Sequence, residues 1–137
     1  MTRALVIDDD ANVAAAIQAI LERHAYQTVH ASRAHAGIHA LQQSKFDVVI
    51  VDIFMPGMGG LDTIKTIRQK APGIPIVAMT GFRLRPSKDP DTDFLMLAIQ
   101  RGATSCVRKP FAPAQLLDAI DKSLGRSPVL NEMSPCH

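Results

Sequence analysis

The stretch Phe-Asp-Val-Val-Ile-Val at residues 46–51, which runs directly into Asp52, decides the fold of this chain. Its last four residues are all β-branched, and its apolar and polar positions do not alternate as they do in a strand with one face in water. Such a run is typical of a strand that is buried on both faces of a parallel sheet. We therefore expect an α/β fold in which helices cover both faces of a central sheet.

The same pattern, a short apolar run followed by a longer amphipathic stretch, occurs five times along the chain. We predict strands in the five apolar runs: Ala4–Ile7, Gln27–Ala31, Phe46–Val51, Pro75–Met79 and Ser105–Val107. We predict helices in the five stretches between and after them: Ala11–Arg23, Ser32–Gln43, a third through Leu61, Ile64 and Ile67, about Asp91 to Arg101, and Ala112–Leu124. Asp10 and Ser32 are the expected N-caps of the first two helices. This alternation predicts a flavodoxin-like, doubly wound sheet of five parallel strands in the order 2-1-3-4-5, with five helices.

The composition narrows the class of protein. With 137 residues, 47% apolar and 20% charged, the chain fits one globular domain, expected over residues 1–125 with a flexible tail over 126–137. Scattered basic residues and a net charge of +2 argue against binding to nucleic acid. No apolar run approaches the roughly 20 residues of a membrane span, and because the apolar run at Ala4–Ile7 is short we expect no signal peptide. We expect a cytoplasmic protein that binds no membrane and whose two cysteines, Cys106 and Cys136, do not form a disulfide.

Polar side chains follow four of the five predicted strands, and only the second lacks a strong candidate. They are Asp8, Asp9 and Asp10 after the first strand, Asp52 after the third, Thr80 after the fourth, and Lys109 after the fifth. In a parallel sheet the carboxyl ends of the strands lie along one edge, and ligands bind there. We therefore expect Asp8, Asp9 and Asp52 to converge, flanked by Thr80 and Lys109.

This combination of side chains suits phosphoryl transfer. Three neighbouring carboxylates repel one another unless a cation lies between them, and Mg²⁺ is a hard ion that prefers such oxygen ligands. A carboxylate can also act as the nucleophile toward a phosphoryl donor, which gives an aspartyl-phosphate. The metal and Lys109 would stabilise the charge that develops on the transferred group, and the Thr80 hydroxyl could bind a phosphate oxygen.

From about Arg3 to Leu124 the chain resembles the receiver domain of two-component response regulators, in particular stand-alone receivers like the chemotaxis regulators. The resemblance rests on motifs that occur in order, each at its expected strand end: Asp8-Asp9, the segment Asp52-Ile53-Phe54-Met55-Pro56-Gly57-Met58-Gly59-Gly60-Leu61, Thr80, Gly102-Ala103, and Lys109-Pro110-Phe111. Any one of these motifs would be weak, but their joint occurrence is specific.

The resemblance implies a role for each matching residue. Asp52 would accept the phosphoryl group, and Mg²⁺ would be held by Asp8, Asp9, Asp52 and the backbone carbonyl of Phe54, with Asp9 a more direct ligand than Asp8. Lys109, followed by a cis peptide bond to Pro110, would pair with the phosphoryl group, and Thr80 would move toward it.

The resemblance also implies partners and a mode of action. The donor would be a phosphohistidine on a sensor histidine kinase or a phosphotransfer protein. The protein would not be an enzyme beyond its own phosphorylation and slow dephosphorylation. Because the chain shows no output domain, its signal would pass through protein–protein contacts.

Three features depart from the family pattern that the resemblance implies. Cys106 stands where many receivers carry the Tyr or Phe that moves together with the threonine, and a small cysteine cannot make that rotation. Gly81 follows Thr80 where alanine is common, which gives the loop extra freedom. Residues Phe82 to Pro90 lengthen the connection that follows, and this insertion is either a lid or partner contact, or a tolerated surface loop.

The predicted fourth helix is more apolar than a helix with one buried face requires. Phe94 to Ile99 are six apolar residues in a row, so we expect Leu95, Met96 or Ile99 to remain on the surface. They would bind a downstream protein or a second copy of the chain. Burial of these residues beneath the inserted loop is the alternative.

Two further pairs of residues each suggest a separate hypothesis. Phe54 lies two residues beyond Asp52, and Phe82 lies two residues beyond Thr80. We expect these rings to exclude the water that would hydrolyse an acyl phosphate, unless they merely pack under the insertion. His35 and His39 have the spacing of a metal-binding pair. Because no acidic residue accompanies these histidines, we expect an exposed helix face instead.

Two other classes of protein remain open. A haloacid-dehalogenase-like phosphohydrolase would use Asp8 as its nucleophile and Asp10 as its second aspartate, but it would leave the segment after Asp52 unexplained. A pseudo-receiver that only binds a partner is suggested by Cys106 and by the altered loop.

Overall fold

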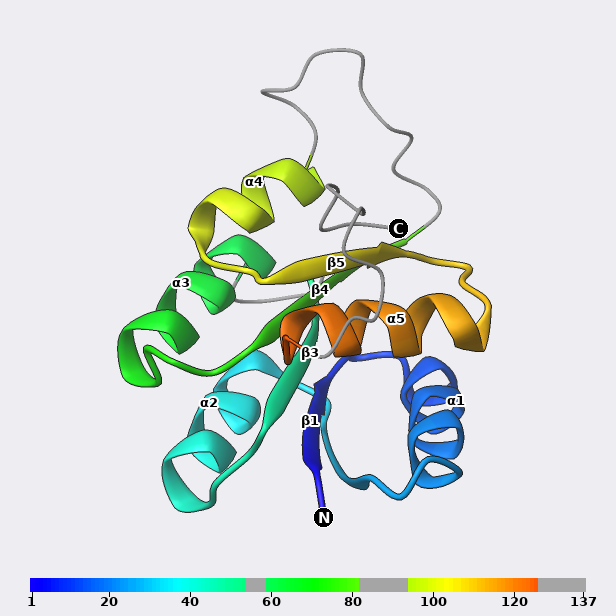
Figure 1. Ribbon diagram of the computed structural model, residues 1–137. Coiled ribbons are helices and arrows are strands. Elements are labelled where there is room, and N and C mark those ends of the chain that lie inside the picture. Colours follow the sequence, from blue (N-terminus) through cyan, green and yellow to red (C-terminus); the bar gives the residue numbers. More distant parts are fainter. Residues whose placement is uncertain (54–58, 82–93, 126–137) are drawn as a thin grey trace.

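The computed structural model describes residues 1–53, 59–81 and 94–125. These residues form a sheet of five parallel strands in the order β2-β1-β3-β4-β5 (Figure 1). The strands are β1 (Arg3–Ile7), β2 (Gln27–Ala31), β3 (Val48–Asp52), β4 (Ile76–Thr80) and β5 (Ser105–Arg108). The helices are α1 (Ala11–Glu22), α2 (Ala34–Gln43), α3 (Gly60–Lys70), α4 (Phe94–Arg101) and α5 (Pro113–Ser123). The predicted flavodoxin-like fold is therefore confirmed.

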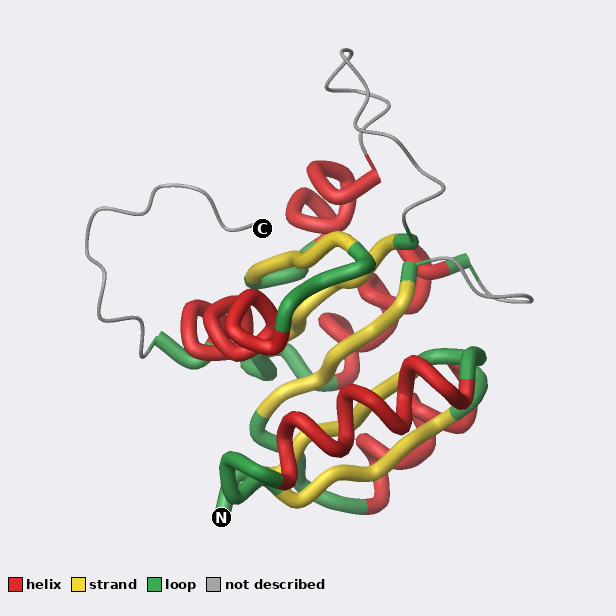
Figure 2. Tube along the Cα trace, turned by 90° about the vertical axis from the view of Figure 1, so that its right-hand side faces the viewer, coloured by secondary structure: helices red, strands yellow, loops and turns green. Residues whose placement is uncertain are grey.

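Helices cover both faces of the twisted sheet. Helices α1 and α5 lie on one face, and α2, α3 and α4 lie on the other (Figures 1 and 2). Consecutive strands are parallel, so each crossover carries the chain back along a helix before the next strand begins. All five strands consequently direct their carboxyl ends to the same edge of the sheet.

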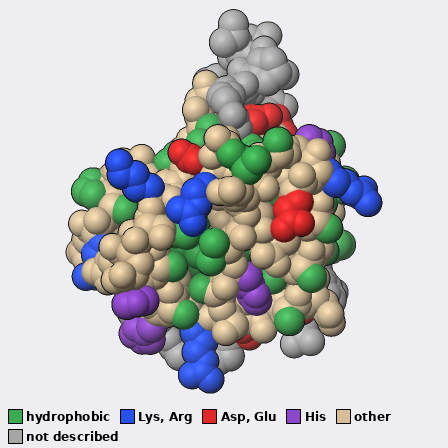
Figure 3. Space-filling model, turned by 90° about the horizontal axis from the view of Figure 1, so that it is seen from below, with side chains coloured by type: hydrophobic (Ala, Val, Ile, Leu, Met, Phe, Trp, Pro, Cys, Tyr) green, Lys and Arg blue, Asp and Glu red, His purple; other side chains and the backbone are tan. Residues whose placement is uncertain are grey.

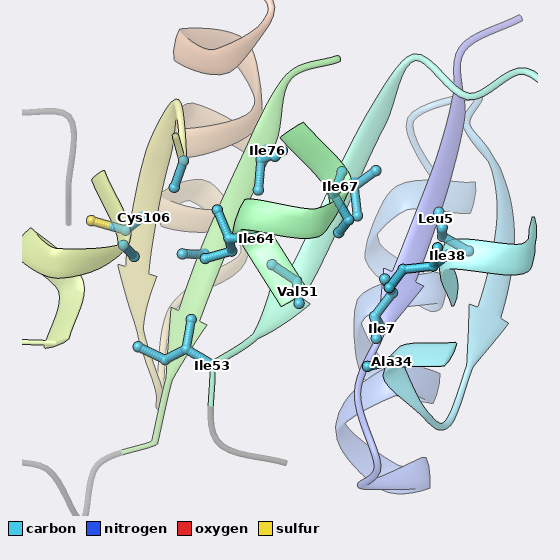
Figure 4. Close-up of a cluster of buried hydrophobic side chains, with 14 of the residues drawn as sticks. Leu5, Ile7, Ala34, Ile38, Val51, Ile53, Ile64, Ile67, Ile76 and Cys106 are labelled. Atoms are coloured by element: carbon cyan, nitrogen blue, oxygen red, sulfur yellow. The ribbon is translucent and has the colours of Figure 1, made fainter. Parts of the chain in front are cut away.

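The alternation of side chains along each strand divides the core between the two faces. In β3, Val48 and Ile50 pack on the α1 and α5 side, whereas Val49 and Val51 pack on the other side. All four side chains are fully buried, as the run of β-branched residues predicts. Figure 4 shows one of the two clusters, in which Val51 lies among side chains from neighbouring strands and helices.

One of the two predicted N-caps is confirmed and the other is wrong. The Asp10 carboxylate accepts hydrogen bonds from the backbone N–H groups of Asn12 and Val13, at 2.9 and 3.2 Å. Helix α2 begins at Ala34 and not at Ser32, and its N-cap is Arg33, which makes no side-chain capping bond. The reason is that Arg33 is extended, which separates the Ser32 hydroxyl from the first helical turn.

The expectation of an unpaired Cys106 is also wrong, because the structure has Cys106 disulfide-bonded. The other cysteine of the chain, Cys136, lies outside the described residues. The distance between two cysteines along the sequence does not determine whether their Cα atoms come within bonding range, so the sequence offered no guide here. The predicted tail at residues 126–137 likewise lies outside the described residues.

Candidate functional site

Four strand ends bring the candidate residues to one edge of the sheet. Asp8 directly follows β1, Asp52 is the last residue of β3, Thr80 is the last residue of β4, and Lys109 directly follows β5. Strands β1, β3, β4 and β5 are successive neighbours in the sheet, so their ends lie side by side. The sheet order therefore brings together residues that are far apart in sequence, such as Asp8 and Lys109, which are separated by 101 positions.

Three carboxylates form an acidic cluster at this edge. Asp8, Asp9 and Asp52 each offer an oxygen, and the three oxygens lie within 4.8 Å of one another. Asp8 is fully buried and Asp52 is 6% exposed, whereas Asp9 is open to solvent. The predicted convergence of the three aspartates is therefore observed, and the cluster has one exposed member through which an ion or a donor could reach it.

Lys109 lies directly against this cluster. Its Nζ is 2.8 Å from Oδ2 of Asp8 and 3.1 Å from Oδ2 of Asp52, and its side chain is 14% exposed. Burial lowers the pKa of Lys109, but the hydrogen bonds to Asp8 and Asp52 and the charges of both carboxylates raise it by more, so the pKa stands above its usual value. Lys109 is therefore a cation at neutral pH. The peptide bond between Lys109 and Pro110 is cis, as the resemblance implies.

Thr80 carries a buried hydroxyl at the end of β4. The residue is 1% exposed, and its Oγ1 has no hydrogen-bond partner among the described residues. A buried hydroxyl without a hydrogen bond is costly and uncommon in folded proteins. Its backbone carbonyl, in contrast, accepts a hydrogen bond from the backbone N–H of Lys109 at 2.8 Å, which ties the ends of β4 and β5 together. The hydroxyl remains available to a ligand at the edge of the sheet.

The three consecutive aspartates have different structural tasks. Oδ1 of Asp8 accepts a hydrogen bond from the backbone N–H of Asp10 at 2.9 Å, and Oδ2 of Asp8 binds Lys109. Asp10 uses its own carboxylate to cap α1. Asp9 makes no hydrogen bond to the other described residues, so it is the carboxylate of the three that is most available to an ion.

Removing the Asp10 carboxylate should therefore affect stability and not metal binding. We expect Asp10→Ala to lower the free energy of unfolding by about 1 kcal/mol, because α1 loses its cap. Asp9→Ala should leave that free energy nearly unchanged but weaken Mg²⁺ binding. Urea unfolding and Mg²⁺ titration calorimetry of both variants check this division, and equal losses of Mg²⁺ affinity in the two variants would contradict it.

His30 in β2 belongs to the site although no sequence pattern predicted it. Its Nε2 donates a hydrogen bond to the backbone carbonyl of Asp8 at 2.7 Å, and the backbone N–H of Asp8 donates to the carbonyl of Ala31 at 3.1 Å. The second strand therefore does contribute a polar side chain to the acidic loop. Its signal in the sequence is a histidine one position before the end of a predicted strand, which is weak without the sheet order.

Comparison with known proteins decides the family. The family model for the response regulator receiver domain matches residues 4–121. The chain belongs to this family. The match covers nearly the whole described domain and includes every strand end discussed above, which favours the receiver family over the haloacid-dehalogenase-like alternative.

Curated relatives and solved structures agree with this assignment of the receiver domain. The sequence of this chain is 30% identical to that of the DNA-binding response regulator MtrA of Mycolicibacterium paratuberculosis. The alignment extends over 125 residues, which are 91% of this chain and 52% of that protein. The chain thus spans about half the length of the curated relatives it matches. A receiver domain protein from Clostridium thermocellum has a TM-score of 0.79, with 29% identity, 92% of this chain and 96% of that chain covered. CheY4 of Vibrio cholerae also has a TM-score of 0.79, with 25% identity and 90% and 99% coverage.

Several expectations for this receiver domain fall on residues outside the described ranges. They concern the Phe54 carbonyl, Phe82 and the insertion up to Pro90; the Leu95 side chain is not described either. In the described part of α4, Met96 is 43% exposed and Ile99 is partly buried against the core, so the expected surface includes Met96. His35 and His39 lie on the exposed face of α2, as expected.

One face of the receiver domain shows how its charged side chains are distributed. On the face shown in Figure 3, Lys and Arg side chains are separated from one another and interspersed with acidic and histidine side chains. No helix in the described parts of the chain has the length and apolar character that crossing a membrane requires.

Proposed function

We propose that this receiver domain is a phospho-accepting switch that takes a phosphoryl group onto Asp52. The observation that carries the proposal is the position of Asp52 between an acidic cluster and a cation: its carboxylate lies within 4.8 Å of Asp8 and Asp9, and 3.1 Å from Nζ of Lys109. The donor would be a phosphohistidine on a sensor histidine kinase or on a histidine phosphotransfer protein, and the reaction would take place in the cytoplasm.

The residues of the acidic cluster fit Mg²⁺. Carboxylate oxygens are the ligands that this hard ion prefers, and it keeps several of its waters, for which the exposed side of Asp9 leaves room. Asp9 and Asp52 would bind more directly than Asp8, because both carboxylate oxygens of Asp8 already accept hydrogen bonds. The backbone carbonyl of Phe54 would be a further ligand. When bound, Mg²⁺ neutralises the charge on the phosphoryl oxygens.

The side chains of the domain supply the rest of the reaction. A carboxylate oxygen of Asp52 attacks phosphorus, the phosphorus–nitrogen bond of the phosphohistidine breaks, and the leaving imidazole keeps the electron pair and is protonated. The ammonium group of Lys109, which lies beside the carboxylates of Asp8 and Asp52, stabilises the negative charge of the transferred group. The Thr80 hydroxyl, which has no hydrogen-bond partner among the described residues, would move toward the phosphoryl group and donate a hydrogen bond to one of its oxygens. This movement of Thr80 would start the switch.

We further propose that the domain acts as a regulator and not as an enzyme with turnover, and that its output passes through protein–protein contacts. The exposed Met96 on α4 marks a surface that a downstream protein or a second copy could bind. Phosphorylation adds negative charge beside Thr80, and the resulting shift at the end of β4 would change the partner preference of the α4 surface.

Intact mass spectrometry tests the proposed function. Incubation with Mg²⁺ and a small phosphodonor such as acetyl phosphate should add one group, making the protein about 80 Da heavier. The gain should disappear with EDTA and in Asp52→Asn. A folded wild-type protein that never gains this mass would instead be a pseudo-receiver that only binds its partner.

A further inference from the structure

His30 reaches from the edge strand into the acidic loop. In the register of the sheet His30 pairs with Val6 of β1 and Ala31 pairs with Ile7, so the next position along β1 is Asp8. The partly buried His30 ring donates its Nε2–H to the Asp8 carbonyl at 2.7 Å. Because a carbonyl oxygen can only accept, the hydrogen must be on Nε2. His30 is thus a side-chain contact between β2 and the metal-ligand candidates.

This hydrogen bond completes the restraint of Asp8. Its backbone N–H donates to the carbonyl of Ala31, Oδ1 accepts from the N–H of Asp10, and Oδ2 binds Lys109. The remaining polar group of Asp8 is its carbonyl, which His30 holds. Every polar group of Asp8 is therefore occupied, and removing the His30 donor would leave the carbonyl as the one group able to turn.

The orientation of the Asp8 carbonyl determines where Asp9 goes. The peptide bond between Asp8 and Asp9 is planar, so fixing its C=O also fixes its N–H and the direction in which the Asp9 Cα leaves. The Asp9 carboxylate has no hydrogen-bond partner of its own among the described residues. Its position beside Asp52 therefore depends on the backbone that carries it.

We propose that His30 is a positioning residue that, through the Asp8 carbonyl, holds Asp9 in place for Mg²⁺. The inference rests on the proposed function, because it presumes that Asp9 is a metal ligand. Groups that orient metal ligands commonly change metal affinity by an order of magnitude when they are removed. His30 does not touch the metal or the phosphoryl group in this proposal.

The chain offers a matched control on the same strand. Thr28 lies two residues before His30, and its hydroxyl accepts a hydrogen bond from Gln18 and donates one to Glu22, both on α1. Thr28→Val removes these bonds between β2 and α1 without touching the acidic loop. His30→Phe keeps a ring but removes the donor, and His30→Gln restores an N–H donor at a similar distance from the backbone.

The test is a Mg²⁺ titration of the four proteins, followed through the backbone amide resonance of Asp9 by NMR. We expect roughly tenfold weaker Mg²⁺ binding in His30→Phe, and affinities close to that of the wild type in His30→Gln and Thr28→Val. His30→Ala gives the same comparison without a bulky side chain if the Phe variant does not fold.

Three outcomes would overturn the inference. Wild-type affinity in His30→Phe or His30→Ala would show that the hydrogen bond does not position Asp9. A loss in His30→Gln as large as that in His30→Phe would show that the donor is not what matters. If the Asp9 resonance of the wild-type protein does not respond to Mg²⁺, the proposed metal site itself is wrong. This result differs from the other two, which concern only the role of His30.

Discussion

Replacing Gly60 with alanine is expected to destabilise the domain by about 3 kcal/mol, although alanine is the better helix former. Gly60 is the first residue of α3, and a Cβ there would lie 2.0 Å from Cα and 2.2 Å from the carbonyl oxygen of Ile53. These are backbone atoms, so no side-chain rotation can relieve the overlap. The N-terminus of α3 and the end of β3 would have to separate.

The adjacent glycine is the control for this prediction. A Cβ at Gly59 would meet only Oδ2 of Asp62, at an ordinary 3.7 Å. Because Gly59 is the N-cap of α3 and alanine is a poorer N-cap than glycine, Gly59→Ala should cost no more than about 1 kcal/mol of the free energy of unfolding. Because Ile53 directly follows Asp52, the Gly60 variant should also be phosphorylated more slowly where it remains folded. Urea unfolding of both variants provides the measurement. Equal stability of the two would mean that Ile53 and α3 do not approach as closely as described.

Removing the charge of Lys109 is expected to separate metal binding from phosphorylation. Lys109→Met leaves the buried Asp8 and the nearly buried Asp52 close together without their counter-charge, which should cost about 3 kcal/mol of stability in EDTA. Mg²⁺ binding should become tighter, because a positive charge that repels the ion is gone. Phosphorylation should nevertheless slow by about a hundredfold, since the cation that stabilises the transferred group is missing.

The signature of this variant is the opposite direction of its two effects. The difference in unfolding free energy between EDTA and Mg²⁺ solutions measures Mg²⁺ binding. The initial rate of mass gain from acetyl phosphate measures phosphorylation. Lys65→Met, at an exposed position on α3, is the matched control and should stay within about 0.5 kcal/mol of the wild type. Wild-type phosphorylation in Lys109→Met, or weaker Mg²⁺ binding, would contradict the role proposed for Lys109.

The sequence predicted the fold and the convergence of the acidic residues for one physical reason. A run such as Val48 to Val51 can be buried on both faces only in a sheet covered on both sides, and in a parallel sheet the carboxyl ends meet at one edge. Once Asp8 and Asp52 were placed at the ends of neighbouring strands, their proximity followed. No detail of side-chain packing was needed for this step.

Other features of the site and the helices could not be predicted, because they depend on side-chain contacts that the periodicity of the sequence does not encode. The alternation of β2 tells which face His30 points to, but not that its ring reaches the Asp8 carbonyl. The sequence placed Lys109 beside the phosphoryl group, but its bond to Asp8 depends on how the connection after β5 bends back across the sheet. Ser32 is a good capping residue in general, but the backbone at Arg33 decides where α2 begins.

The phosphoacceptor role of Asp52 is tested by locating the phosphoryl group on the chain. Protein phosphorylated by acetyl phosphate in Mg²⁺ can be treated with borohydride, which reduces an aspartyl-phosphate to homoserine, and then sequenced by tandem mass spectrometry. We expect homoserine at position 52 and nowhere else. Homoserine at position 8 would show that Asp8 is the phosphoacceptor and would contradict the role proposed for Asp52.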